Sequence, residues 1–259
     1  MRDDLVLEIR GLNKRFGPTH ANKDIDFTLK RGEIRGLIGE NGSGKSTLIS
    51  QIAGIHMRDS GEMFVNGQPY NPHNPLDANN AKISMVMPEL GVVGNLSAGI
   101  NVFLGRTKQF SRFGIVNMKK VNKAAQAEFE KWNLTMPRLN EMTGDMMIES
   151  RKMIELARAL SVDPDILLLD EVTQSLSLNN RSKLYDLIKK FRDMGRSIIV
   201  ITHDIEEMVE ITDTITVLRD GEVVGNVNSR ETTPDEIRLM MVGREINGDY
   251  YRADMTPTG

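Results

Sequence analysis

The sequence predicts an α/β fold in which a parallel sheet is joined by an antiparallel β layer and a helical subdomain. The apolar runs at 166–169 and 198–201 are continuous, which is typical of parallel strands covered on both faces. The runs at 5–9 and 25–29 alternate between apolar and polar residues, which indicates strands with one buried face. Residues 89–160 follow a mostly helical pattern with Gly and Pro breaks.

The length and composition are consistent with one globular domain. The chain has 259 residues, of which 39% are hydrophobic, so it is long enough to bury a large core. We expect a single domain over 5–245, a helical lobe at about 89–160 and a polar tail at 246–259.

Charge and cysteine content exclude several functions. The net charge is -3, so no basic excess marks nucleic acid as a partner. The absence of cysteine excludes disulfides and thiol chemistry. Residues 1–4 do not resemble a signal peptide, and no apolar stretch approaches the ~18 residues that span a bilayer. We therefore expect a cytoplasmic protein whose membrane role comes through a partner.

The N-terminal third is expected to contain the antiparallel layer. A strand at 62–65 is followed by Asn66-Gly67, the strongest short signal for a tight hairpin. Residues 71–81 are rich in Asn and Pro, which predicts turns before a strand at 83–87.

Helical stripes and turn signals organise the rest. Trp132 falls on the apolar face of a helix at 118–133, which favours a core position over a base-stacking one. A second stripe at 184–191 links the two parallel strands in a βαβ unit. Asp220-Gly221 predicts another hairpin, and Thr233 to Glu236 form a capping box before a short helix.

The glycine-rich stretch at 39–47 is the strongest functional signal. It follows an apolar strand, opens a helix and fits G-x-x-x-x-G-K-[ST], so a chance glycine turn is disfavoured. Backbone amides and the helix dipole there form a cradle for phosphates. This indicates a P-loop NTPase core of the RecA-like kind, in which Lys45 reaches the phosphates and Ser46 ligates Mg²⁺. The expected cofactor-binding residues in this loop are Gly39, Glu40, Asn41, Gly42, Ser43, Gly44, Lys45, Ser46 and Thr47.

Two strand ends carry candidate catalytic residues. Asp170 and Glu171 end one apolar strand, where open α/β sheets bind their ligands. Asp170 is expected to hold Mg²⁺, and Glu171 to orient the water that attacks the γ-phosphate. His203 ends the next strand and is expected to contact the γ-phosphate or that water. We predict Lys45, Glu171 and His203 as catalytic, with Ser46 and Asp170 as metal ligands.

With these motifs in order, the chain resembles the nucleotide-binding subunit of ABC transporters. Phe16 lies where that family stacks an aromatic ring on adenine. Residues 95–106 and 153–160 resemble the first half of bacterial monosaccharide (ribose/galactose-type) importer ATPases, and 240–244 resembles the junction that ends that half. The resemblance implies ATP and Mg²⁺ as cofactors, and membrane permease subunits and a second ATP-binding subunit as partners. It also implies a peripheral place on the cytoplasmic face of the inner membrane.

Several positions depart from the family pattern. The signature Leu-Ser-Gly-Gly-Gln, which faces the partner's γ-phosphate, aligns with 146–150, where Met147 removes a hydroxyl and Glu149 adds a charge. At ~5 Å and an effective dielectric of 20, that charge repels a phosphate charge by roughly 3 kcal/mol. The alternative is that Glu149 favours its own helix N-terminus, by under ~1 kcal/mol. Pro88 replaces a glutamine that meets Mg²⁺ and water, and Ser177 replaces an aspartate.

The sequence therefore predicts an ATP-hydrolysing subunit of a bacterial sugar importer, paired in a heterodimer with an ATPase whose signature is intact. The alternative is a catalytically weak, regulatory ATP-binding module of such a complex. A soluble ABC protein acting on ribosomes or DNA is disfavoured, because neither tandem domains nor a basic segment is found.

Overall fold

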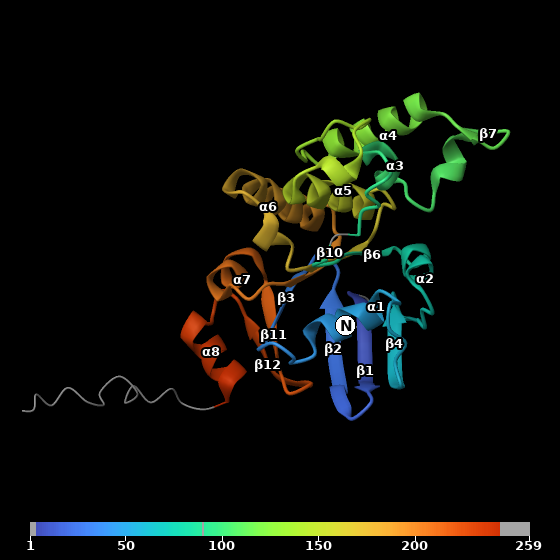
Figure 1. Ribbon diagram of the computed structural model, residues 1–259. Helices are drawn as coiled ribbons and strands as arrows, with labels where there is room; N and C mark the ends of the chain where they lie inside the picture. Colours follow the sequence, from blue (N-terminus) through green and yellow to red (C-terminus); the bar gives the residue numbers. More distant parts are fainter. Residues whose placement is uncertain (1–3, 90, 244–259) are drawn as a thin grey trace, which may run out of the picture.

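The computed structural model describes residues 4–89 and 91–243, and its centre is a six-stranded sheet (Figure 1). The strand order is β12-β11-β3-β10-β9-β6, and all neighbours are parallel except β11 and β12. The strands are β3 (Ile34–Ile38), β6 (Ile83–Val86), β9 (Ile166–Asp170), β10 (Ser197–Ile201), β11 (Thr214–Arg219) and β12 (Glu222–Asn228). The predicted parallel βαβ unit is confirmed, since β9 and β10 pair side by side.

A four-stranded antiparallel sheet packs beside this core, as predicted. Its order is β2-β1-β4-β5. The first two strands run further than the alternation indicated, and the strands are β1 (Leu5–Phe16), β2 (Thr19–Lys30), β4 (Ser60–Val65) and β5 (Gln68–Pro69). Asn66 and Gly67 have φ of 50° and 73°, the left-handed pair that a tight hairpin needs.

Helices cover both faces of the parallel sheet. On one face, α1 shares a buried cluster with β1, β2, β9 and β10. On the other, α4, α5 and α6 share the largest buried cluster with β3, β9 and β10. The helices are α1 (Lys45–Ile52), α2 (Pro75–Asn80), α3 (Ala98–Val102), α4 (Met118–Lys131), α5 (Ile148–Leu160), α6 (Leu178–Asp193), α7 (Ile205–Ile211) and α8 (Pro234–Val242).

The helical lobe contains α3, α4, α5 and a small hairpin. The hairpin pairs β7 (Ser111–Arg112) with β8 (Ile115–Val116) and follows the 3₁₀ turn η1 (Thr107–Phe110). Trp132 is 1% exposed and its ring lies 5.8 Å from that of Phe191, so its core position is confirmed. The limits of the domain and lobe stay predictions.

Two helices, α2 and α7, were not predicted from the sequence. Residues 75–80 form α2, although the composition of 71–81 indicated turns. The Asn74 side chain accepts hydrogen bonds from the amides of Leu76 and Asp77, and Pro75 occupies the first helical position. The Asn and Pro residues that indicated a turn therefore form the start of a helix. The capping box of α8 is confirmed, and the polar tail at 246–259 lies outside the described residues.

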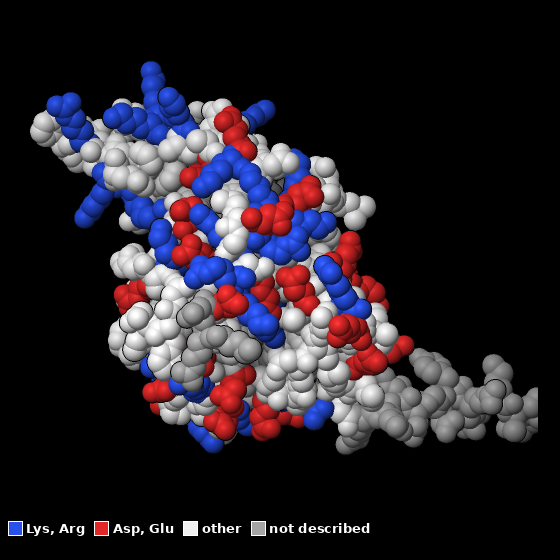
Figure 2. Space-filling model, turned by 180° about the vertical axis from the view of Figure 1, so that it is seen from behind, with Lys and Arg blue, Asp and Glu red and all other residues white. Residues whose placement is uncertain are grey.

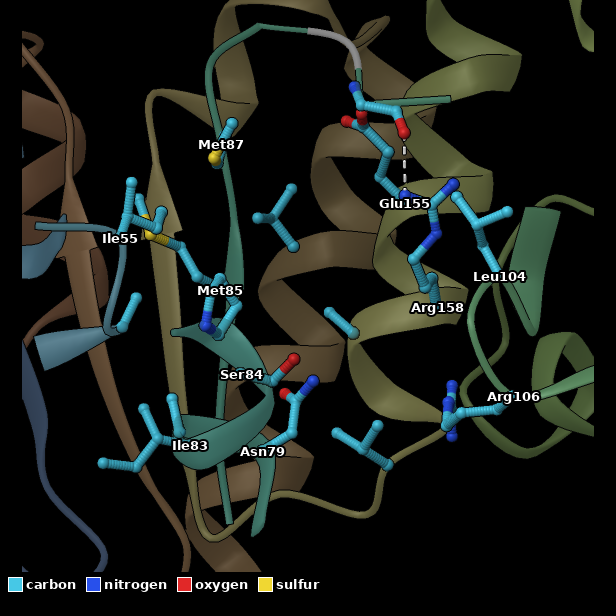
Figure 3. Close-up of a pocket in the computed structure, with 17 residues that line it drawn as sticks. Ile55, Asn79, Ile83, Ser84, Met85, Met87, Leu104, Arg106, Glu155 and Arg158 are labelled. Atoms are coloured by element: carbon cyan, nitrogen blue, oxygen red, sulfur yellow. Dashed lines mark hydrogen bonds between the residues drawn. The ribbon is translucent and has the colours of Figure 1, made fainter. Parts of the chain in front are cut away.

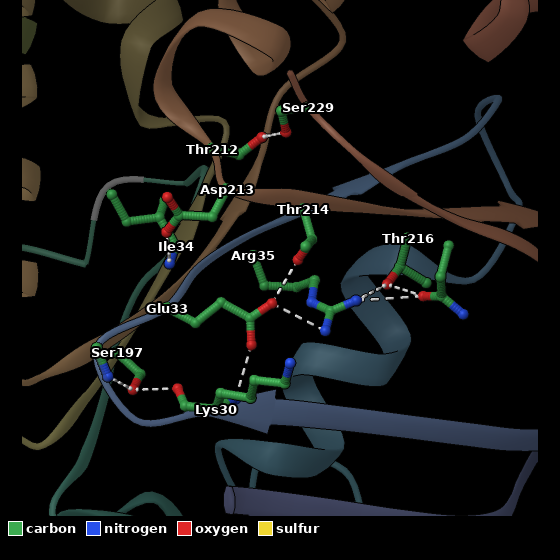
Figure 4. A network of polar contacts seen from close by, with 12 residues as sticks. Lys30, Glu33, Ile34, Arg35, Ser197, Thr212, Asp213, Thr214, Thr216 and Ser229 are labelled. Carbon is green, nitrogen blue, oxygen red and sulfur yellow. Dashed lines mark hydrogen bonds and ion pairs between the residues drawn. The ribbon is translucent and has the colours of Figure 1, made fainter. Parts of the chain in front are cut away.

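A buried polar network ties the strands together (Figure 4). The Glu33 carboxylate pairs with Arg35 at 2.9 Å and accepts hydrogen bonds from the Lys30 amide and the Thr214 hydroxyl. Arg35 also donates to Thr216 and Asn226.

Across the described ranges, no helix is long and apolar enough to cross a membrane.

Candidate functional site

The loop at 39–47 connects β3 to α1 and is closely packed at two glycines. A Cβ on Gly39 would lie 2.1 Å from the carbonyl oxygen of Leu218, and one on Gly44 would lie 2.2 Å from that of Ala21. Gly44 also has φ of 99°, which side chains rarely adopt. Only glycine fits both positions, so the loop's path is fixed by its sequence.

Lys45 lies across this loop. Its ammonium donates to the carbonyl oxygens of Gly39 at 2.8 Å and Glu40 at 2.9 Å. Burial lowers the pKa of Lys45, while the charges of Glu171 and Asp170 oppose that shift. The loop, the lysine and both predicted carboxylates are therefore brought together.

Asp170 is the last residue of β9 and is 1% exposed. Burial raises its pKa to about 6, although a hydrogen bond with the Ser46 hydroxyl acts in the opposite direction. Its Oδ1 and the Ser43 hydroxyl are buried and have no hydrogen-bond partner. Two orphaned polar atoms beside the loop indicate that a polar ligand completes this site.

The residues fit a Mg²⁺ ion bound together with phosphates. In the described part of the chain, no cluster of three His, Cys, Asp or Glu residues forms a metal site of its own. Mg²⁺ is usually held by one or two carboxylates, waters and substrate phosphates. Asp170 and Ser46 match that requirement.

Glu171 and His203 lie close together at the ends of the adjacent strands β9 and β10. The His203 Nδ1 lies 3.6 Å from the Glu171 carboxylate. Gln174 joins them: its Nε2 donates to Glu171 at 2.6 Å and lies 3.2 Å from His203 Nδ1. Gln174 was not predicted from the sequence, where its signal is only a polar residue one turn after Glu171.

Phe16 lies at the turn between β1 and β2 and is 42% exposed. Its ring stands edge-on to that of His56, with centroids 5.1 Å apart, and the Lys14 ammonium lies 5.3 Å from it. An exposed ring held by two neighbours is available to stack on a base, so its adenine role stays a prediction.

The loop that contains Pro88 is held by a buried lysine. The Lys152 ammonium donates to the carbonyl oxygens of Met87 at 2.8 Å and Pro88 at 3.2 Å. It also pairs with Glu155 at 2.7 Å, and Glu155 accepts from the Gly91 amide. Lys152 thus holds the backbone on both sides of the position where Pro88 replaces the expected glutamine.

A cavity of about 440 Å³ lies next to this loop (Figure 3). Its walls come from β6, α2, α5 and the segments after α1 and α3. They are largely apolar, with Arg106, Glu155 and Arg158 as the charged residues.

At the signature position, Glu149 does not serve only its own helix. It lies in the first turn of α5, but its carboxylate accepts hydrogen bonds from the Ser177 amide (2.7 Å), the Ser177 hydroxyl (2.6 Å) and Asn180 (2.7 Å). Those bonds lower the pKa of Glu149. The first-turn position agrees with the predicted alternative, and the hydrogen bonds add a second role, because the carboxylate also holds Ser177, the N-cap residue of α6. Met147 beside it is 77% exposed.

Comparison with known sequences gives consistent matches. The sequence model of the family described as ABC transporter matches residues 22–174. A Burkholderia cenocepacia protein, provisionally described as a ribose/galactose/methyl galactoside import ATP-binding protein, is 37% identical over 97% of this chain and 48% of its own length. The ribose import ATP-binding protein RbsA of Chromobacterium violaceum is 36% identical over 98% of this chain and 50% of its own length. The chain spans about half the length of the curated relatives it matches.

Solved structures share the fold. The dimeric cassette MJ0796, from a bacterial ABC transporter, superposes with a TM-score of 0.76 at 25% identity, covering 87% of this chain and 100% of that one. MJ1267, an ATP-binding cassette in its ADP conformation, gives a TM-score of 0.75 at 19% identity, covering 96% and 99%. The α/β P-loop fold expected from the sequence is therefore confirmed.

Proposed function

The chain belongs to the ABC transporter family, and we propose that it binds and hydrolyses ATP to energise a bacterial importer of monosaccharides. The observation that carries the proposal is the convergence of the loop at 39–47 with Asp170, Glu171 and His203. The sugar class rests on relatives named for ribose and galactose import.

The residues divide the chemistry between them. The loop amides and Lys45 bind the phosphates, and Asp170 and Ser46 would hold Mg²⁺, which would supply positive charge beside the γ-phosphate. Glu171 accepts a proton from the water that attacks the γ-phosphorus. The bond from that phosphorus to the β–γ bridging oxygen breaks, which gives ADP and inorganic phosphate. His203 orients the γ-phosphate, and Phe16 stacks on adenine.

We propose a heterodimer as the working assembly. Met147 offers no hydroxyl, and the hydrogen bonds to Ser177 and Asn180 keep Glu149 ionised at the edge where a partner's phosphate would bind. A partner with an intact signature would complete the site at Lys45, while this chain's signature leaves the other site weak.

The second partner is a pair of membrane permease subunits, which would place the chain peripherally on the cytoplasmic face of the membrane. The cavity between β6 and α5 is suited to an apolar permease segment, because its walls are largely apolar, and Met87 at the end of β6 lies in its lining. Movement at the cavity would reach the nucleotide through the loop that contains Pro88.

A regulatory, non-hydrolysing module is the second candidate. Gln174 supports it, because its amide engages the Glu171 carboxylate that should orient water.

Two measurements test these proposals. Steady-state ATP hydrolysis by the chain alone should be slow and should rise when a partner ATPase is added. Rapid, cooperative turnover by the chain alone would contradict the heterodimer. In the assembled complex, Glu171→Gln should abolish most of the ATP hydrolysis at this site. The control Glu210→Gln, at an exposed position in α7, should leave that hydrolysis unchanged. If Glu171→Gln leaves ATP hydrolysis by the complex unchanged, the catalytic proposal is wrong and the regulatory ATP-binding module is the remaining candidate.

A further inference from the structure

The β7–β8 hairpin carries two apolar side chains at its tip that the described part of the chain leaves uncovered. Phe113 is 91% exposed and Ile115 is 76% exposed. The ring of Phe113 is flanked by the Arg112 guanidinium, 5.3 Å from its centroid. In Figure 1 the hairpin projects from the end of the helical lobe.

The backbone of Phe113 is unfavourable for a bulky residue. Phe113 and Gly114 have φ of 53° and 81°, the pattern of a two-residue turn that favours Asn, Asp or Gly. An aromatic residue in this conformation is strained, and full exposure returns no burial energy to the fold. Folding therefore does not account for Phe113, which points to a contact outside the chain.

The expectation that the chain has no basic segment is wrong here, because Lys and Arg flank this tip along the sequence. Residues 91–127 contain no Asp or Glu and six Lys or Arg. Arg106 is bonded to Ser161 at the cavity wall, and the other five are Lys108, Arg112, Lys119, Lys120 and Lys123. Lys119 and Lys120 lie in the first turn of α4, where the helix dipole favours acidic residues. Figure 2 shows Lys and Arg side chains gathered over the end of the molecule that carries the hairpin. Because the positive charges of Lys119 and Lys120 oppose the stability of α4, they too indicate a partner outside the chain.

The hairpin is held rigidly at its base. The Phe110 ring packs against Phe103, with centroids 4.8 Å apart. The Asn117 amide donates to the Phe110 carbonyl at 3.0 Å, and the Asn117 side chain caps α4 through the Lys120 amide. The tip is therefore presented in one orientation and needs little ordering on binding.

We propose that the β7–β8 hairpin and the basic residues on either side of it, residues 108–123 in all, bind the surface of an anionic lipid bilayer. Phe113 and Ile115 would enter the headgroup region, and the surrounding Lys and Arg side chains would contact lipid phosphates. A projecting apolar tip ringed by positive charge matches a flat anionic surface. The inference does not depend on the proposed function, since it concerns the chain and lipid alone.

The test is vesicle co-sedimentation of the purified chain at low salt. The native chain should bind vesicles with one third phosphatidylglycerol at least about tenfold more tightly than pure phosphatidylcholine, and high salt should release it. Phe113→Ser with Ile115→Ser should weaken binding about tenfold. Lys119→Glu with Lys120→Glu should weaken it by more than about tenfold.

Matched variants lie outside the hairpin. Leu178→Ser removes an apolar side chain that is 83% exposed, and Lys30→Glu with Lys189→Glu reverses two exposed charges. Both should bind vesicles like the native chain. If they weaken binding as much as the hairpin variants, or if the hairpin variants bind normally, the proposal is wrong.

Tryptophan fluorescence tests the proposal with a variant that should still bind vesicles. The native chain has one Trp, which is buried, so Phe113→Trp adds a reporter at the tip. Its emission should shift to the blue on anionic vesicles and be quenched by brominated lipid. An unshifted spectrum would overturn the proposal, as would binding of single-stranded nucleic acid in place of vesicles.

Discussion

Replacing Lys152 with Met should strongly destabilise the chain, because the lysine is one half of a buried ion pair. The side chains of Lys152 and Glu155 are 2% and 7% exposed and lie 2.7 Å apart. Lys152→Met leaves the Glu155 carboxylate buried without its cation, and the carbonyls of Met87 and Pro88 lose their donor. Breaking such a pair from one side costs about 3 kcal/mol of unfolding free energy, at the low end of the range because Glu155 keeps the Gly91 amide.

Urea unfolding of the native chain, Lys152→Met, Glu155→Gln and the double variant completes a double-mutant cycle that measures this effect. Lys152→Met with Glu155→Gln removes both charges and should cost only about 1–2 kcal/mol, so the double variant should be more stable than Lys152→Met alone. Lys189→Met, at an exposed position, should change stability by less than about 0.5 kcal/mol. A loss under about 1 kcal/mol for Lys152→Met would refute the reasoning, since the pair would then contribute no more than an exposed one.

Three further predictions concern the site. The pKa of Asp170 is raised to about 6 from its ordinary value of 3.8, so its ionisation disfavours the folded state as pH rises through this range. Asp170→Asn should therefore stabilise the ligand-free chain by about 2 kcal/mol at pH 7, a gain that vanishes below about pH 4 in thermal or urea unfolding. Gly44→Ala should abolish ATP binding in calorimetry through its backbone clash, whereas Gly42→Ala, which meets open space, should cost only about 1 kcal/mol of backbone strain; equal binding by both would contradict the packing argument. Glu149→Ala should lower the unfolding free energy by about 1–2 kcal/mol even without nucleotide, because the amide and hydroxyl of Ser177 at the start of α6 lose their acceptor; an unchanged urea midpoint would contradict this contribution of Glu149.

The core of the fold could be predicted because each element carries its own periodic signal. Continuous apolar runs marked the parallel strands, and Asn66-Gly67 marked a hairpin. α2 was missed because Asn and Pro are used both in turns and at helix starts, and only the cap hydrogen bonds of Asn74 separate the two.

The sequence by itself determined the phosphate loop and the strand ends that face it. Parallel strands end at one edge, so Asp170, Glu171 and His203 had to approach Lys45 once the strands were assigned. Only the tertiary structure decided the side-chain partners. Contacts between different elements place Gln174 between Glu171 and His203, Lys152 beneath Pro88, and Glu149 against Ser177, the N-cap residue of α6. Such contacts depend on how helices and loops pack against one another, which no local pattern in the chain records.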